Sequence, residues 1–128
     1  MPRATELKIR VDDRPGVLGE IALALGEKKV NLRAVNAWVE GTQGILRMVV
    51  DKTAAAKKAL AAKGVAFEEK EILEVDLADK PGELGRLAQK LGAAGINIQY
   101  VFAGTAKGKK VSAFLGVPDV KAAMAAAR

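Results

Sequence analysis

Two short segments of this sequence combine residue types that could bind a small zwitterion. Each begins with an aspartate, continues through a proline and a glycine, and enters a run with helical periodicity; the segments are residues 13–19 and 79–85. In the first segment, we expect Gly16, Val17 and Leu18 to open a helix. Their backbone N–H groups would lie at its positive end and suit a carboxylate. Asp13 could accept an ammonium group or cap the helix.

Asn31 adds an amide, with one acceptor and two donors, at the start of the next expected strand. We expect it to lie near the end of the preceding strand, beside Asp13. A carboxylate, free N–H groups and an amide together match a free α-amino acid. The second segment repeats the set with Asp79, Gly82, Glu83, Leu84 and Asn97.

A purely structural interpretation of the same residues stays open. Asp-x-Pro-Gly is also a good strand-to-helix turn, with the aspartate as the helix cap and the glycine giving room. Asn31 could then hydrogen-bond only the backbone of its own loop. The repetition does not decide between the two interpretations, because folding requirements duplicate as readily as binding sites.

The composition excludes several kinds of chemistry. The chain has no cysteine and no histidine, so disulfides, thiolate or imidazole metal sites and Ser-His or Cys-His nucleophile pairs are excluded. No carboxylate pair, phosphate-binding loop or metal cluster stands out among the remaining residue types. We therefore expect no catalytic residue, no metal and no cofactor, and a protein that is not an enzyme.

The net charge of +6 raises the question of nucleic acid. No basic block exceeds three residues, and the RNA-recognition signature K/R-G-F/Y-G/A-F-V-x-F/Y is missing, although Trp38, Tyr100 and Phe102 could lie on a sheet. We expect no nucleic-acid partner. No apolar run approaches the length of a membrane span, and the N-terminus lacks a signal-peptide pattern, so we expect no membrane association and a cytoplasmic protein.

An internal duplication organises the chain. With an offset of 66 residues, 13–37 aligns with 79–103 without a gap, and eleven of the 25 positions are identical. The identical positions of the first copy are Asp13, Pro15, Gly16, Leu18, Gly19, Ala22, Leu25, Gly26, Asn31, Val35 and Ala37. The fold is therefore predicted for each repeat separately.

Periodicity predicts strand, helix, strand, strand, helix and strand in the first repeat. The strands are expected over 6–12, 30–39, 45–50 and within 65–77. The helices follow Pro15, with Leu18, Ile21, Ala22 and Leu25 on one buried face, and Thr53, as a cap, up to residue 63. This order is the split-βαβ or ferredoxin-like arrangement, an α+β fold with antiparallel sheets and both helices on one face.

The duplication predicts two such repeats, residues 1–70 and 71–128. The second is truncated after its last helix, 119–127, so its sheet either has an open edge or takes a strand from elsewhere. Residues 65–77 are long enough to bridge the two sheets. The first helix of repeat 2 should end on a left-handed Gly95; repeat 1 has Lys29 at that position.

The motifs Asp-Arg-Pro-Gly-Val-Leu-Gly with a later Val-Asn-Leu, and Asp-Lys-Pro-Gly-Glu-Leu-Gly with Ile-Asn-Ile, resemble the signature of ACT domains, small regulatory modules that bind amino acids. The resemblance covers essentially the whole chain. The chain is similar to the small stand-alone tandem-ACT proteins. In that family the effector sits at the interface between paired domains or subunits. It is held by the loop after the first strand and by the asparagine opening the second.

Carried over residue by residue, the resemblance implicates two sets of ligand-binding residues. They are Asp13, Arg14, Gly16, Val17, Leu18, Asn31 and Leu32, and Asp79, Lys80, Gly82, Glu83, Leu84, Asn97 and Ile98. It also implies a free amino acid as effector, a homo-oligomer such as a dimer, and a partner enzyme to regulate. A ligand-free structural or dimerisation module is the alternative.

Overall fold

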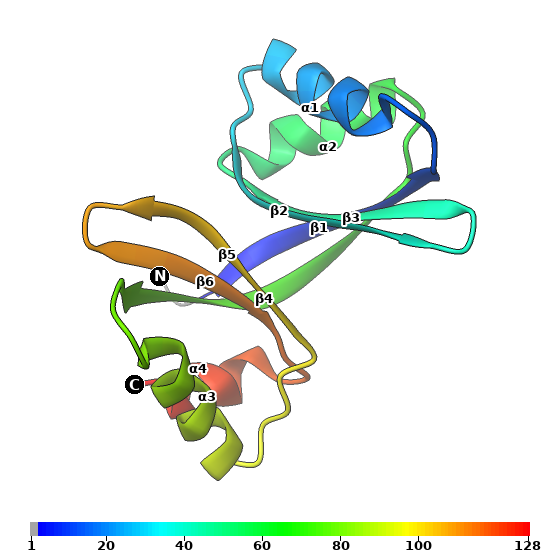
Figure 1. Ribbon diagram of the computed structural model, residues 1–128. Helices are drawn as coiled ribbons and strands as arrows, with labels where there is room; N and C mark the ends of the chain where they lie inside the picture. The colour runs from blue at the N-terminus through cyan, green and yellow to red at the C-terminus, as the bar shows by residue number, and fades with distance from the viewer. Residues whose placement is uncertain (1–2) are drawn as a thin grey trace. The chain divides into compact units, whose positions relative to one another are not determined.

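The computed structural model describes residues 3–128, which form two compact units (Figure 1). The first unit consists of residues 5–70. The second consists of residues 71–128 together with Arg3 and Ala4. The α+β fold class expected from the sequence is confirmed, with antiparallel strand pairs and four helices.

The first unit contains one complete strand-helix-strand-strand-helix-strand repeat. Its elements are β1 (Arg3–Asp12), α1 (Val17–Glu27), β2 (Leu32–Glu40), β3 (Gln43–Val50), α2 (Thr53–Ala62) and the start of β4 (Phe67–Ala78). The strands follow the order β2-β3-β1-β4, and β3 is antiparallel to both β1 and β2. Both helices cover one face of these strands (Figure 1). The core between them includes Leu7, Ile9, Leu25, Leu46, Met48 and Leu60.

The second unit repeats this arrangement with the rest of β4, then α3 (Glu83–Ala93), β5 (Tyr100–Lys107), β6 (Lys110–Gly116) and α4 (Val120–Ala126). Its strand order is β1-β4-β6-β5, with β6 antiparallel to β4 and β5. Helices α3 and α4 lie on one face (Figure 1). Their core includes Leu73, Leu87, Leu91, Leu115, Val120 and Ala123.

The beginning of β1 fills the strand position that repeat 2 lacks. Arg3 Nη1 lies 3.2 Å from Glu71 Oε2 on β4, and Arg3 Nε donates to Met124 Sδ on α4 at 3.4 Å. Of the two alternatives that the sequence left open, the structure therefore takes the strand from elsewhere in the chain. Strand β4 runs without a break from the first unit into the second.

Two expected helix caps are wrong. Asp13 does not cap α1, because Gly16 occupies the cap position with φ +87°, and Gly82 does the same for α3 with φ +86°. Only glycine adopts this left-handed conformation without steric cost, and it has no side chain to bond the helix. Thr53 is the first residue of α2 and not its cap, since Lys52 precedes the helix.

The buried face of α1 is also narrower than periodicity predicts. Ile21 and Leu25 are buried as expected, but Leu18 is 46% exposed. Its counterpart Leu84 on α3 is exposed to the same extent. Both leucines lie in the first turn of their helix, next to the Asp-x-Pro-Gly loops.

The left-handed end of each first helix is confirmed. Gly95 has φ +75° after α3, and Lys29, with φ +60° after α1, is the one non-glycine residue with positive φ in the described chain. Backbone bonds from Lys29 N–H to the Gly26 carbonyl and from Val30 N–H to the Leu25 carbonyl close this end.

Lys29→Gly should therefore stabilise the protein by up to about 1 kcal/mol, because it removes the cost of a side chain in the left-handed region. Urea unfolding measures the change. The matched substitution Gly95→Lys should destabilise by a similar amount. Unchanged or lower stability in Lys29→Gly would show that the Lys29 side chain offsets its own backbone strain.

Candidate functional site

The loop after β1 carries the first set of expected binding residues. The Asp13 N–H donates to the Thr42 carbonyl at 3.2 Å, which ties the loop to the β2–β3 turn. The Asp13 side chain is exposed and forms no ion pair within residues 3–128. Pro15 and Gly16 make the turn, and α1 begins at Val17. The first N–H groups of the helix and a free carboxylate thus occur in one loop, as the sequence predicts.

A cavity of about 440 Å³ lies beside this loop in the first unit. Of the expected residues, Arg14 and Val17 line it; Asp13, Gly16 and Leu18 do not. The other lining residues come from β1, α1, β3 and the loop before β4. About half are charged or polar, namely Arg10, Asp12, Glu20, Gln43 and Lys63, and the rest are apolar or small, namely Val11, Ile21, Gly64, Val65 and Ala66. This cavity is mixed in polarity.

Arg14 is held against α1 by a bidentate ion pair. Its Nη1 and Nη2 donate to the two carboxylate oxygens of Glu20 at 3.0 and 2.7 Å. The hydrogen bond and charge of Arg14 lower the pKa of Glu20 below its ordinary value, and Glu20 raises the pKa of Arg14. Arg14 is therefore already engaged with a carboxylate of the protein.

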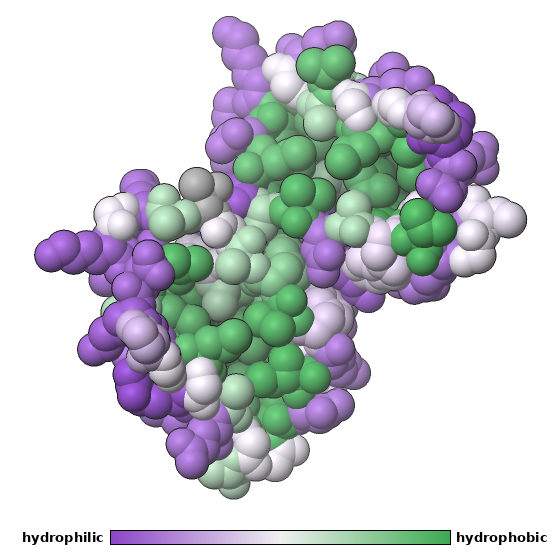
Figure 2. Space-filling view, in the orientation of Figure 1, coloured by the Kyte–Doolittle hydropathy of each residue, from purple (hydrophilic) through white to green (hydrophobic). Residues whose placement is uncertain are grey.

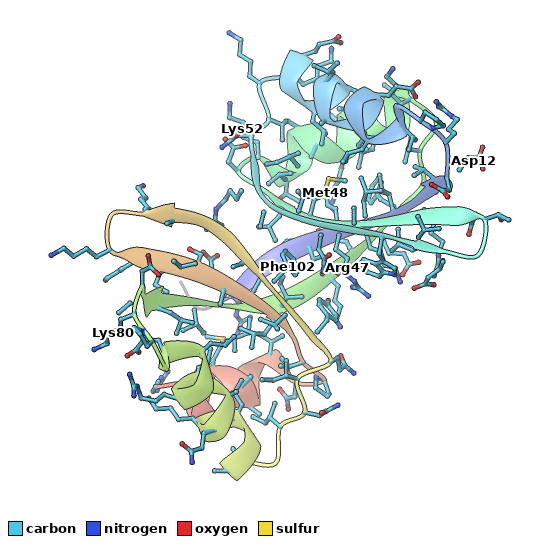
Figure 3. The ribbon with its side chains drawn as sticks, in the orientation of Figure 1. Asp12, Arg47, Met48, Lys52, Lys80 and Phe102 are labelled. Atoms are coloured by element: carbon cyan, nitrogen blue, oxygen red, sulfur yellow. The ribbon has the colours of Figure 1, made fainter. Side chains whose placement is uncertain are left out.

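The second unit has a cavity of about 380 Å³ beside the loop after β4. Four expected residues line it: Asp79, Lys80, Glu83 and Leu84. The remaining wall is apolar or small and is built by the end of β4 and by β5 and β6; it consists of Leu77, Ala78, Val101, Phe102, Ala103, Val111 and Ala113. Figure 3 shows Lys80 at the start of α3 and Phe102 on β5.

Glu83 does not leave an unbalanced negative charge at this cavity. Arg86 Nη2 donates to Glu83 Oε1 at 2.6 Å, and Lys80 Nζ lies 3.5 Å from the same oxygen. The hydrogen bond from Arg86, assisted by the Lys80 charge, lowers the pKa of Glu83. Asp79, by contrast, is exposed and forms no ion pair within residues 3–128.

The expected proximity of Asn31 to Asp13 is wrong. Strands β1 and β2 are both antiparallel to β3, so they run in the same direction. Asp12 and Glu40 both align with Gln43, which places the loop after β1 beside the end of β2. Asn31 and Leu32 lie at the other end, about 30 Å away at the usual rise of a strand. Figure 3 shows Asp12, at the end of β1, and Lys52, which follows β3, at opposite ends of the strands of the first unit.

The same separation applies to the second unit. Lys110 pairs with both Ala78 and Lys107, whereas Asn97 and Ile98 precede Tyr100, which pairs with Gly116 at the far end of β6. Ile98 packs against the core of the unit, and Asn97 is exposed. Neither unit brings its asparagine to its own Asp-x-Pro-Gly loop.

Asn31 contributes to the fold through its backbone. Its N–H donates to Asp51 Oδ1 at 2.9 Å, and its carbonyl accepts from the Asp51 N–H at 3.1 Å. Its amide side chain forms no hydrogen bond within residues 3–128. The purely structural interpretation of this side chain, as a partner of the loop backbone, is wrong.

Apolar residues of the edge strands lie next to the core but are partly exposed. On β2, Val35 pairs with Met48 and Ala37 with Leu46; on β5, Val101 pairs with Leu115 and Ala103 with Ala113. These four partners belong to the cores of the two units. The helices leave the residues of β2 and β5 uncovered, however, and Val35 and Val101 are each 42% exposed. In each unit of Figure 2, apolar residues gather between the helices and the strands.

Within residues 3–128 no group of three or more acidic side chains is placed to hold a metal ion. No helix among the described residues is long and apolar enough to cross a membrane. The arrangement that remains is two loop-and-helix junctions, each with an adjacent cavity.

Comparison with known proteins supports the resemblance for the first repeat: residues 5–63 match the family model of the ACT domain. None of the curated proteins compared matches the chain.

Solved structures share the fold of the whole chain. A protein from Bacteroides thetaiotaomicron is 23% identical with a TM-score of 0.89, over 97% of this chain and 85% of that one. The ligand-free regulatory subunit of aspartate kinase from Thermus thermophilus is 19% identical with a TM-score of 0.72, over 100% and 90%. Its counterpart from Thermus flavus is 19% identical with a TM-score of 0.61, over 99% and 91%.

The Arg14–Glu20 pair predicts a pH-dependent contribution to stability. Because the pKa of Glu20 is lowered in the folded protein, its contribution is present above the unfolded pKa, about 4.3, and is lost as pH falls through the folded value. Glu20→Gln should therefore lower the melting temperature slightly at pH 7, and the difference from wild type should vanish in acid. The effect should also shrink with salt, since both side chains are exposed.

Glu27→Gln, which removes another exposed glutamate of α1, serves as the control. A Glu20→Gln difference that stays constant from pH 7 to strong acid would contradict an electrostatic origin.

Proposed function

We propose that this protein is a cytoplasmic regulatory module of two ACT-like repeats, residues 1–70 and 71–128, that binds a free amino acid and modulates a partner enzyme. The observation that carries the proposal is that both units form a cavity where the Asp-x-Pro-Gly loop meets the start of a helix. Small-molecule sites are typically concave and combine a few polar groups with apolar walls.

The loop groups suit the two ends of a zwitterion. The exposed carboxylates of Asp13 and Asp79 are available for an ammonium group. The first N–H groups of α1 and α3, with Lys80 at the second loop, would hold the carboxylate. Binding needs no bond-breaking chemistry, which agrees with the absence of histidine and cysteine.

The asparagines would reach the loops from a second copy of the chain. Strand β2 is at the edge of the first unit, and if two β2 strands paired antiparallel, the start of one would lie beside the end of the other. The end of β2 is beside the loop after β1. A symmetric dimer would thus bring Asn31 of each copy close to Asp13 of the other, and the exposed Leu18, Val35 and Val39 would be covered.

A partner enzyme follows from what a regulatory module must do. A ligand regulates only if its binding changes another equilibrium, through a coupling free energy of typically about 1–3 kcal/mol. The structurally similar Thermus proteins are regulatory subunits of aspartate kinase, which supports the same kind of role here.

The exposed apolar residues of the edge strands also favour a second candidate function, a structural pairing module without a ligand. Apolar side chains on an edge strand suit association with another chain. The two functions differ in their response to amino acids.

A thermal-shift screen of the twenty amino acids at millimolar concentration tests the proposal. A bound amino acid should raise stability by about 2.7 kcal/mol at a hundredfold excess over Kd. Asn31→Ala should remove the part of this response that comes from the first site, yet change the stability of the free protein by no more than about 0.5 kcal/mol, because the backbone bonds to Asp51 remain.

Asn36→Ala, within β2 opposite Arg47, is the matched control and should keep the ligand response. No shift with any amino acid, or a large loss of stability in Asn31→Ala without an effect on ligand, would favour the structural module.

A further inference from the structure

We infer that the cavity of the second unit takes an amino acid with a large apolar side chain, such as leucine, isoleucine or phenylalanine. This inference rests on the proposed function and specifies the ligand class for one of its two sites. It depends on three features of the cavity: its apolar wall, the short side chain of Ala113 and the polar groups at its loop.

The wall opposite the loop consists of apolar or small residues from three strands. Val101 and Ala103 come from β5, Val111 and Ala113 from β6, and Leu77 from the end of β4. Leu84 of α3 adds a further apolar side chain. A polar ligand group placed against this wall would lose its bonds to water without gaining new ones, which costs free energy. An aliphatic or aromatic group would gain free energy by burial there.

A short side chain in the middle of the sheet borders the cavity. Ala113 pairs with Val75 and Ala103, just as Leu46 of the first unit pairs with Ile9 and Ala37. Ala113 and Leu46 are therefore equivalent positions. Leu46 is 3% exposed and packs in the core of its unit. Ala113 lines the cavity, and its side chain occupies less space there than a leucine would.

Polar groups that could fix the two ends of an amino acid are confined to the loop end of the cavity. Asp79 and Lys80 follow β4 directly, and Glu83 already shares its charge with Arg86 and Lys80. A zwitterion bound there would direct its side chain toward Val101, Ala103 and Ala113. The volume of about 380 Å³ is within the range of small-molecule pockets, about 300–1,000 Å³.

The first unit does not offer the same environment. Its cavity is lined by the charged residues Arg10, Asp12, Arg14, Glu20 and Lys63 as well as by the apolar residues Val11, Val17, Ile21, Val65 and Ala66. An apolar side chain bound there would lie beside charged groups and would gain less by burial than in the second unit. Selectivity for apolar amino acids is thus expected of the second unit alone.

Calorimetric titration of the full chain tests the inference. The probes are L-leucine, L-isoleucine and L-phenylalanine, compared with L-serine, L-aspartate and L-lysine. We expect the apolar probes to bind at least tenfold more tightly. Val101→Thr keeps the shape of the side chain but adds a hydroxyl, and should weaken leucine binding about fivefold. Ala113→Leu should abolish it by filling the cavity.

Val75→Thr is the matched control, because Val75 is a half-buried valine of the same unit that does not line the cavity. It should leave leucine binding unchanged. If Ala113→Leu fails to fold, as judged by circular dichroism, the comparison of Val101→Thr with Val75→Thr decides.

Three results would overturn the inference in distinguishable ways. Tight binding of a polar amino acid, unaffected by Val101→Thr and Ala113→Leu, would refute the ligand class and leave the proposed function standing. Equal binding of leucine and 4-methylpentanoate, which lacks the amino group, would show an apolar pocket that does not select amino acids. No binding of any probe, with Val101→Thr changing the monomer–dimer equilibrium in sedimentation, would refute both proposals and assign the cavity to contact between copies.

Discussion

Strand β3 forces β1 and β2 to run in the same direction, because it is antiparallel to both. The positions of the expected binding residues relative to one another depend on this constraint. The loop after β1 and the start of β2 are separated by the length of a strand, so one repeat cannot assemble the complete set of expected ligand groups. Strand β6 imposes the same separation between Asp79 and Asn97. We therefore propose that a complete site needs an antiparallel neighbour at the edge strand, which would couple ligand binding to association.

The two repeats share their loops and differ in their interiors. Gly16 and Gly82 adopt almost the same left-handed conformation, so both helices start in the same way. Beneath the helices, Leu46 fills a position that Ala113 leaves open. Duplication thus preserved the backbone geometry that presents N–H groups, while the cavities beside the two loops are lined by different elements and differ in polarity. Similar loops do not imply similar ligands.

The second unit takes a segment from the first repeat of the sequence. Strand β1 contributes Arg3 and Ala4 to the second unit, whereas the first unit consists of residues 5–70 alone. The second unit therefore depends on the first repeat for its fourth strand. This arrangement explains how residues 71–128 form a four-stranded unit although no strand follows α4.

The sequence by itself determined the order of elements, the fold class and the two loops, because these depend on local periodicity and on turn residues such as Pro15 and Gly16. It also predicted the strained Lys29, since the duplication aligns it with Gly95. Tertiary structure decided what depends on contacts distant in sequence. Strand direction placed Asn31 far from Asp13, strand pairing brought Ala103 and Ala113 together in the wall of the second cavity, and Arg3 lies beside Glu71. Periodicity cannot predict these, because a strand or helix pattern does not specify which distant segment will lie beside it.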